Sequence, residues 1–312
     1  MGLSKMLAKS RMFTSIFDLE DKLAARKDGV HPVEISPHRF DIIQGRLEST
    51  EGGPPVRLLP YMLSCLAGIR ESLESVDQNP QEPKTAASPQ LIQELAAKAH
   101  ALGVSSIGYT RLPGRWVFQG KGVLYPNAIV LTMEMDAEGI NSAPSVACMR
   151  TVMETYRDLG RINNQLAAYL REEGYGAHAG HPLNGLALYP PLAEMAGLGW
   201  MGLNGLIITP EHGPRVRLGA VFTSIENLPF NEGNEHRWVR EFCDRCRICH
   251  RECPPGAFYE HPVEHDDGRV TYVDNSLCFP YFNEYHGCSV CVKVCPFNRQ
   301  PYERIKAGFL GE

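Results

Sequence analysis

Eight of the ten cysteines lie between residues 243 and 295: seven in two regularly spaced segments, and Cys278 between these segments as the first cysteine of the second arm. The first arm, CDRCRICHRECP at residues 243–254, has the spacing C-x2-C-x2-C-x3-C-P. After Cys278 the second arm continues with CSVCVKVCP at residues 288–296, which has the spacing C-x2-C-x3-C-P. Thiolates at x2 spacing can wrap one face of an iron–sulfur cubane, and in the two-cluster arrangement the fourth cysteine of each arm binds the other cluster. The spacing therefore predicts two 4Fe-4S clusters.

This crossing divides the cysteines into two predicted ligand sets. The first set is Cys243, Cys246, Cys249 and Cys295. The second set is Cys253, Cys278, Cys288 and Cys291. Cys278 stands ten residues before Cys288, where a compact ferredoxin has an x2 spacing, so we expect a longer loop beside the second cluster.

Zinc and disulfides explain the cysteines less well. A structural zinc site takes four ligands, usually as two pairs, and gives no role to the third cysteine of the first arm or to the Cys-Pro endings. Disulfides need an oxidising compartment, and the N-terminal sequence MGLSKMLAKSRMFTSIF has no long apolar core, cleavage site or paired arginine. No window reaches the 18 or so apolar residues of a membrane helix. We therefore expect a cytoplasmic protein without stable membrane insertion.

The composition leaves room for a large second part of the protein. At 312 residues and 43% apolar content, the chain can bury one large core or two modest ones, and the cysteine module needs only about 60 to 70 residues. The net charge of -5 gives no global electrostatic signature of nucleic-acid binding.

Hydrophobic periodicity predicts an α/β layer in the middle of the chain. Apolar residues recur at helical spacing over 57–76, 91–99 and 145–173, and apolar runs of strand length cover 104–109, 128–135 and 215–225. Cys65 and Cys148 fall within helical segments, so we expect both to be packing residues. Residues 77–88, rich in Pro, Gln and Glu, are predicted to be a linker.

The glycines between residues 180 and 228 fit two explanations equally. Gly197, Gly199, Gly202, Gly205 and Gly213 either let the backbone approach a flat, bulky cofactor or make ordinary tight turns. They do not form G-x-G-x-x-G after a strand, so a Rossmann dinucleotide site is not predicted.

A family resemblance rests on this stretch and on the cysteines that follow it. The segment AGLGWMGLNGLIITPEHGPRVRLGAVFTS, with the two-cluster module, resembles the cobalamin-dependent reductive dehalogenases and the related epoxyqueuosine reductases. The segments LGVSSIGY, YPNAIVLTMEM and LREEGYGA extend the resemblance over about residues 89 to 300. The first 85 residues do not contribute to it.

The resemblance implies an α/β (α+β) architecture in which a nitroreductase-like domain holds a base-off corrinoid and a bacterial ferredoxin-like module carries the two 4Fe-4S clusters. The expected organisation is an N-terminal helical extension and linker (1–85), a corrinoid-binding domain (86–232), a ferredoxin-like domain (233–302) and a C-terminal tail (303–312). The expected corrinoid contacts are Gly197, Gly199, Trp200, Gly202, Asn204 and Gly205.

The two branches of the family differ at the active site. Epoxyqueuosine reductases carry an acidic proton donor and a lysine in a G-W-x-G-K pattern, where this chain has Leu183 or Asn184 and then Leu203. The GLGW segment, in contrast, is more similar to the tRNA-modifying branch. Dehalogenases pair a tyrosine with an arginine and a lysine or asparagine. The matching candidates are Tyr156, Asn184 and Arg215 or Arg217.

Each candidate has an expected role and a simpler alternative. Tyr156 would donate a proton, Asn184 would hydrogen-bond the substrate or the tyrosine, and Arg215 or Arg217 would hold the halide or an anionic substrate. Alternatively, Tyr156 is a core aromatic residue and the arginines are surface charges or partners of corrin side chains. The two arginines flank Val216 and are expected on one face of a strand. His178 and His181 are either proton donors or substrate contacts, or solvated loop residues.

The resemblance thus implies an oxidoreductase that reductively removes a halide or similar leaving group from a small molecule such as an organohalide. The expected electron donor is an external ferredoxin or flavodoxin. Reduction of epoxyqueuosine in tRNA is the first alternative. A corrinoid-handling or electron-transfer protein without a substrate of its own is the second.

Overall fold

A computed structural model describes residues 11–37, 56–265 and 270–311. The chain divides into two units. The first takes in residues 1–133, 156–192 and 218–231, and the second takes in residues 134–155, 193–217 and 232–312. The domain boundaries expected from the sequence stay predictions, and residues 1–10 and 38–55 of the expected N-terminal extension lie outside the described residues.

A four-stranded sheet with the order β1-β2-β6-β3 organises the first unit. Its strands are β1 (Ser106–Arg111), β2 (Asn127–Glu134), β3 (Ala177–Gly180) and β6 (Val216–Thr223). β1 pairs antiparallel with β2, and β3 pairs antiparallel with β6. The three strands predicted from apolar runs are confirmed. β3 has only the four residues AHAG, which are too few to give a recognisable run.

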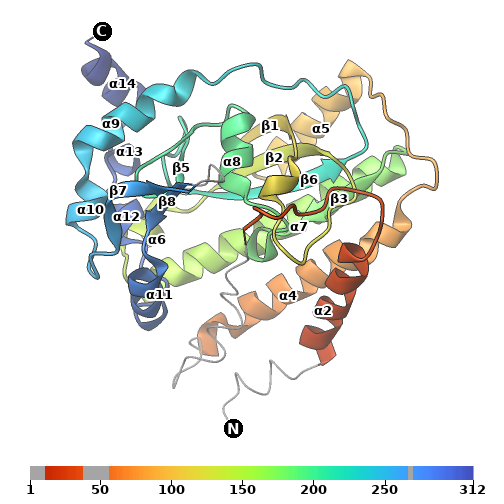
Figure 1. The fold of residues 1–312 in the computed structure, drawn as a ribbon, viewed down its shortest axis with the longest axis horizontal. Coiled ribbons are helices and arrows are strands. Elements are labelled where there is room, and N and C mark those ends of the chain that lie inside the picture. Colours follow the sequence, from red (N-terminus) through yellow and green to blue (C-terminus); the bar gives the residue numbers. More distant parts are fainter. Residues whose placement is uncertain (1–10, 38–55, 266–269, 312) are drawn as a thin grey trace. The chain divides into compact units, whose positions relative to one another are not determined.

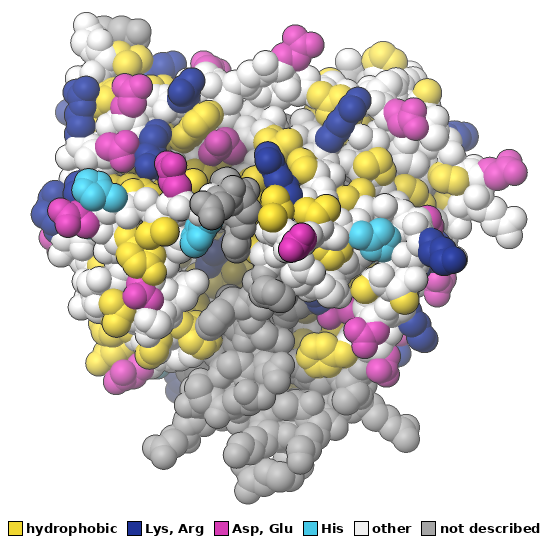
Figure 2. Space-filling view, in the orientation of Figure 1, with side chains coloured by type: hydrophobic (Ala, Val, Ile, Leu, Met, Phe, Trp, Pro, Cys, Tyr) yellow, Lys and Arg dark blue, Asp and Glu magenta, His cyan; other side chains and the backbone are white. Residues whose placement is uncertain are grey.

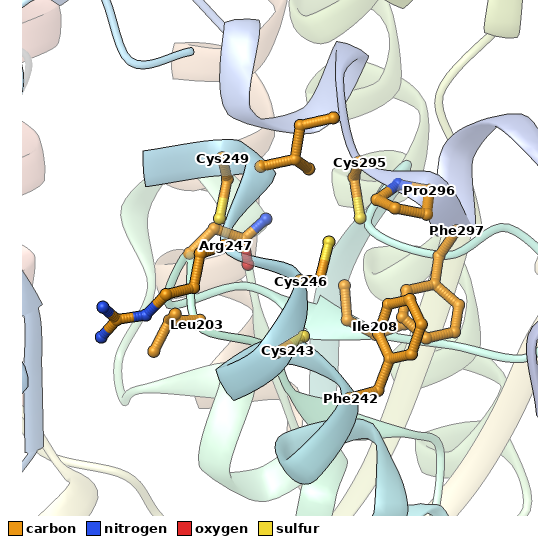
Figure 3. Close-up of a pocket in the computed structure, with 12 residues that line it drawn as sticks. Leu203, Ile208, Phe242, Cys243, Cys246, Arg247, Cys249, Cys295, Pro296 and Phe297 are labelled. Carbon is orange, nitrogen blue, oxygen red and sulfur yellow. The ribbon is translucent and has the colours of Figure 1, made fainter. Parts of the chain in front are cut away.

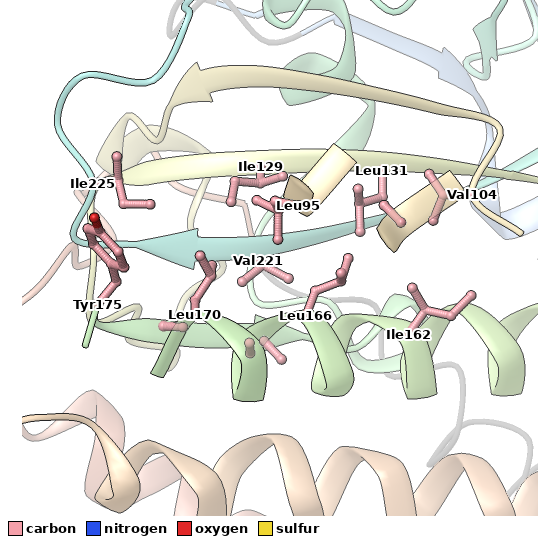
Figure 4. Close-up of a cluster of buried hydrophobic side chains, with 14 of the residues drawn as sticks. Leu95, Val104, Ile129, Leu131, Ile162, Leu166, Leu170, Tyr175, Val221 and Ile225 are labelled. Carbon is pink, nitrogen blue, oxygen red and sulfur yellow. The ribbon is translucent and has the colours of Figure 1, made fainter. Parts of the chain in front are cut away.

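The main core of this unit lies between the sheet and the helices α5 (Pro89–Ala101) and α7 (Val146–Glu172), both close to their predicted ranges. Leu95 of α5 and Leu166 of α7 are almost completely buried. In Figure 4 these side chains meet Ile129 of β2 and Val221 of β6 in one apolar cluster. Helical periodicity thus gave the correct buried faces, because the apolar stripe of each helix is what packs on the sheet.

Two N-terminal helices also belong to the first unit: α2 (Arg11–Ala24) and α4 (Leu59–Glu74), flanked by the 3-10 turns η1 (Val56–Leu58) and η2 (Ser75–Gln78). Ile69 of α4 packs with Ile16 and Leu23 of α2. The Ser72 hydroxyl donates a hydrogen bond to a carbonyl of β3, which ties α4 to the edge of the sheet. Cys65 is fully buried, as predicted, and burial raises the pKa of its thiol to about 12.

The second unit contains two small antiparallel hairpins and several short helices. The hairpins are β4 (Trp200–Met201) with β5 (Ile207–Ile208), and β7 (Phe258–Glu264) with β8 (Val270–Val273). The helices are η5 (Glu235–Arg237), α9 (Trp238–Cys246), α10 (Ile248–Arg251), α11 (Asn275–Glu284), α12 (Val290–Lys293), α13 (Pro296–Arg299) and α14 (Tyr302–Leu310). The residues expected to form a C-terminal tail are therefore largely helical.

An aromatic cluster forms the core of the second unit. Trp238 at the start of α9 lies with its ring centroid 5.1 Å from that of Tyr302 and 5.8 Å from that of Phe297. Phe309 of α14 contacts the same tryptophan. Such tilted and edge-on pairs add to the free energy gained from burial, so they hold α9, α13 and α14 together.

The remaining elements connect the strands and helices. They are η3 (Gly114–Trp116), α6 (Ala137–Asn141), η4 (Pro182–Asn184) and α8 (Tyr189–Met195). The alternation of helices and strands in Figure 1 confirms the expected mixed α/β class. Among the described helices, none combines the length and the apolar character needed to cross a membrane. On the face drawn in Figure 2, basic and acidic side chains are interspersed.

The core of the first unit can be tested at Leu166. Replacing Leu166 by Ala removes a completely buried side chain, so the free energy of unfolding should fall by about 2–5 kcal/mol. Its neighbour Gln165 is exposed on the same helix, and Gln165→Ala should change the value by no more than about 0.5 kcal/mol. Denaturant titration followed by circular dichroism measures both. Equal effects of the two substitutions would contradict this description of the core.

Candidate functional site: two cysteine cavities

Four cysteines from both arms surround one cavity in the second unit. The cavity has about 290 Å³ of empty space, and its thiols are those of Cys243, Cys246, Cys249 and Cys295. In Figure 3 the sulfur atoms of these four residues surround a common space. Apolar side chains, including Leu203, Ile208 and Phe242, form the rest of its wall.

Local backbone structure presents these thiols. Cys243 and Cys246 lie in the last turn of α9, which ends at Arg247 in the left-handed conformation (φ 50°). The reversal at Arg247 starts α10, which carries Cys249. Cys295 comes from the other arm and stands directly before α13. The chain thus changes direction between Cys246 and Cys249, where α9 ends and α10 begins. This change of direction lets cysteines at x2 spacing border the same cavity.

The other four cysteines line a second and larger cavity. It has about 890 Å³ of empty space and is bordered by Cys253, Cys278, Cys288 and Cys291. Cys278 lies on α11 and Cys291 on α12. Cys288 lies in a turn in which residues 286–289 all have positive φ, between 44° and 81°. The long segment between the arms thus builds β7, β8 and α11 along this cavity.

The donor set and its surroundings fit 4Fe-4S clusters. Each cavity offers four thiols, and the backbone N–H of Ala257 lies 3.4 Å from the sulfur of Cys253. N–H···S bonds of this kind are common around iron–sulfur clusters and influence their reduction potential.

Burial raises the pKa of two thiols of the first set. Desolvation raises the pKa of Cys243 to about 12 and that of Cys249 to about 11, and neighbouring cysteines add to both increases. Four thiolates in one small cavity would repel each other unless a cation compensated their charge. The thiol sets are therefore suited to a group that brings its own positive charge.

The two candidate arginines have different surroundings in the second unit. Arg215 precedes β6 and donates hydrogen bonds to the Glu134 carboxylate and to the Met135 carbonyl, the latter at 2.9 Å. Arg217 lies within β6, is half-buried and lines the second cysteine cavity. Their expected placement on one strand face stays a prediction, because Arg215 lies before the first residue of the strand.

Tyr156 and Asn184 belong to the first unit. Tyr156 is half-buried on α7, one turn before Gly160, whose backbone packs against the ring of His181. Asn184 ends η4 and is buried. Residues four apart share a helix face, so Tyr156 points to the side of α7 on which His181 lies. The catalytic roles of Tyr156 and Asn184 stay predictions.

His178 and His181 are buried, so the explanation that they are solvated loop residues is wrong. His178 lies in β3 and His181 directly after it. Desolvation lowers the pKa of each imidazole to about 3, helped at His178 by the charges of Arg171 and Arg26. Both rings are therefore neutral near pH 7, and neither carries a readily lost proton.

The expected corrinoid contacts form a turn in the second unit. Gly199 has φ 154°, and a Cβ atom there would stand 2.1 Å from the carbonyl oxygen of Ile208. Gly205 adopts φ 72° in the turn between β4 and β5. Both glycines are therefore required by the hairpin itself, whatever it contacts. Asn204 borders both cysteine cavities, while Trp200 packs against the aromatic core. The corrinoid contacts, including Gly197 and Gly202, stay predictions.

Comparison with known proteins agrees with this geometry. Residues 242–299 match the 4Fe-4S dicluster domain family. A tetrachloroethene reductive dehalogenase from Desulfitobacterium hafniense is 32% identical over 211 residues, which cover 63% of this chain. Over this part of its length the chain is similar to the reductive dehalogenases. The match takes in only 37% of the length of that relative.

The chain is also similar to an epoxyqueuosine reductase and to a solved reductive dehalogenase structure. An epoxyqueuosine reductase from Listeria monocytogenes is 33% identical over 115 residues, which cover 35% of this chain and 29% of that protein. The solved structure of the catabolic reductive dehalogenase NpRdhA in complex with 3-bromo-4-hydroxybenzoic acid has the same fold. It matches with a TM-score of 0.64 and 22% identity over 79% of this chain and 38% of that one. The expected fold is thus confirmed.

Sequence reasoning missed two residues that lie beside Asn184. The Asn184 amide donates to one oxygen of Glu20 on α2, and the other oxygen is paired with the Lys121 ammonium. The side chains of Glu20 and Lys121 are only 5% and 8% exposed. No local pattern marks either residue, because their partners lie far away along the chain.

The buried pair can be tested by removing its acid. Glu20→Ala leaves the Lys121 charge buried without its carboxylate, so we expect the free energy of unfolding to fall by about 3–5 kcal/mol. Glu74 offers a matched control, because its ion pair with Arg70 is 47% exposed on both sides. Glu74→Ala should cost less than about 1 kcal/mol. Denaturant titrations of both variants measure the difference, and a loss at Glu20 as small as that at Glu74 would contradict the buried pair.

Proposed function

We propose that this protein is a corrinoid-dependent iron–sulfur reductase, most similar in activity to a reductive dehalogenase. The observation that carries the proposal is the gathering of four thiols around each of two cavities, in a chain related to such enzymes. The first cysteine set would hold one 4Fe-4S cluster and the second set the other. Two clusters suit a protein that passes electrons singly to a further centre.

The corrinoid is the proposed electron acceptor of the clusters. Residues of the glycine-rich turn fit this in one respect, since Asn204 and Leu206 line the second cysteine cavity and Asn204 also lines the first. A group contacted by this turn would therefore lie beside the thiols that supply its electrons. When bound, the corrinoid would supply a low-valent cobalt able to reduce a carbon–halogen bond.

The net reaction consumes two electrons and one proton. The carbon–halogen bond breaks, the halide leaves, and a carbon–hydrogen bond forms in its place. Tyr156 would give the proton at its phenol oxygen, and Asn184 would orient the substrate or the tyrosine. Arg215 or Arg217 would hold the halide or an anionic substrate. Arg215 is bound to the Glu134 carboxylate, and Arg217 borders the second cysteine cavity.

The proposed partners follow from the chemistry. The substrate would be a small molecule such as an organohalide, and an external reductant such as ferredoxin or flavodoxin would supply the electrons. A cytoplasmic location would suit the reduced thiols of this chain.

Epoxyqueuosine reduction in tRNA is a second candidate function. One observation supports it: the acid that this branch carries near residues 183–184 is missing from the sequence there, yet Glu20 brings a carboxylate to Asn184. Anaerobic turnover of epoxyqueuosine-modified tRNA, without halide release from a panel of halogenated phenols, would replace the dehalogenase proposal by this one.

Metal content tests the ligand sets. Anaerobic reconstitution should give about eight iron and eight sulfide per chain, as two 4Fe-4S clusters require. Cys278→Ser should weaken the binding of one cluster, so the iron content should fall toward half of that of the unaltered chain. Cys65→Ser is the control, because Cys65 is buried in α4 of the first unit and should leave the iron content unchanged. An unaltered iron content in the Cys278 variant would contradict its assignment.

The role of Tyr156 can be tested on the same helix. Tyr156→Phe should lower turnover of a halogenated substrate by about 10²- to 10⁴-fold, since it removes the proposed general acid. Tyr169→Phe is the control: Tyr169 lies on the same helix and bonds Glu94 in an exposed position. Halide release under anaerobic conditions measures both. Equal turnover in the two variants would contradict the catalytic assignment of Tyr156. Electron transfer without halide release from any substrate would favour a corrinoid-handling or electron-transfer protein.

A further inference from the structure

The two cysteine cavities differ in the charges around them. Arg217 lines the second cavity, and its charge also acts on the nearby thiol of Cys148. Cys148 packs in one cluster with Val292 and Cys291, and both of these residues line the second cavity. Arg217 therefore borders the cavity that the second cysteine set surrounds.

A helix N-terminus adds to the positive potential at the second cavity. Cys148 is in the first turn of the 27-residue helix α7, and its N–H is capped by the Ser145 hydroxyl at 3.0 Å. The N-terminal end of a helix carries a partial positive charge. Lys293 of α12 is the other cation in this neighbourhood, with its ammonium donating to the Ala143 carbonyl at 2.6 Å.

The first cavity lies at the C-terminal end of a helix. Cys243 and Cys246 occupy the last turn of α9, where the helix carries a partial negative charge. Arg247 borders this cavity, but its guanidinium group turns away from the four sulfurs, as Figure 3 shows, and donates to the carbonyl of Glu260. Charged groups close to these cysteines in the chain are already engaged. Asp244 pairs with Arg240, and Arg251 donates to the Cys246 carbonyl at 2.9 Å.

We propose that Arg217 raises the reduction potential of the cluster held by the second cysteine set and so directs electrons from the first cluster to the second. Reduction adds one electron to a cluster and forms or breaks no bond, so a fixed neighbouring cation stabilises the reduced form. This role rests on the two clusters of the proposed function and adds a direction of electron flow to it. Arg217 acts here on the cluster through its charge.

The experiment compares Arg217→Gln with Arg215→Gln in the reconstituted full chain. Redox titration followed by electron paramagnetic resonance measures both clusters, and Cys278→Ser identifies the signal of the second one. In Arg217→Gln the ratio of reduced to oxidised second cluster at a fixed potential should fall about tenfold, which is about 59 mV for one electron. The first cluster should not shift. Arg215→Gln should shift neither, because the Arg215 side chain is held by Glu134.

A conservative variant separates the charge from the shape of the side chain. Arg217→Lys keeps the charge and should keep most of the potential of the second cluster. Two results would overturn the role of Arg217: an unchanged potential of the second cluster in Arg217→Gln, or an equal shift in Arg215→Gln. Either result would leave the proposed function standing. Absence of both cluster signals from the unaltered protein would overturn the proposed function, and this inference with it.

Discussion

The exchange of one cysteine between two arms is the constraint on which the second unit depends. Cys295 of the second arm lies among the thiols of the first, and Cys253 of the first arm lies among those of the second. Neither cavity can form unless both arms are in place, so the arms must fold as one body. The aromatic cluster around Trp238 supports this, because it joins α9, which carries thiols of the first arm, to α13, which directly follows Cys295.

The first unit contains a buried ion pair, in which each charge is tolerated because the opposite charge lies beside it. Glu20 and Lys121 are nearly excluded from solvent, and an isolated ion at such a site would cost several kcal/mol. Each charge has its counterion, and the Asn184 amide adds a hydrogen bond to the carboxylate. Replacing such a pair by apolar residues is often neutral for stability, so stability alone does not explain it. A pair of this kind fixes the geometry of the asparagine.

The features predicted from the sequence are local, and those missed depend on distant contacts. The cysteine sets could be predicted because the x2 and x3 spacings span only a few residues. The helices α5 and α7 could be predicted from their apolar period, and β2 from a continuous apolar run, because it is buried on both faces. The contact between Glu20 and Asn184 joins residues 164 positions apart, and no pattern in one sequence records such a pairing. The histidines were difficult for a related reason. HAGH has the composition of a loop, but β3 pairs with β6, and Gly68 of α4 and Gly160 of α7 lie against the ring of His181.

The two arginines have different partners although a single residue separates them. Alternation along a strand predicts residues 215 and 217 on one face where both residues are extended within the sheet. Arg215 directly precedes β6, its carbonyl accepts a hydrogen bond from the Met135 N–H, and its side chain is held by Glu134 and the Met135 carbonyl at the end of β2. Arg217 is inside the strand and lines the second cysteine cavity. Arg215 thus ties the start of β6 to the end of β2, while Arg217 borders the cavity of the second cysteine set.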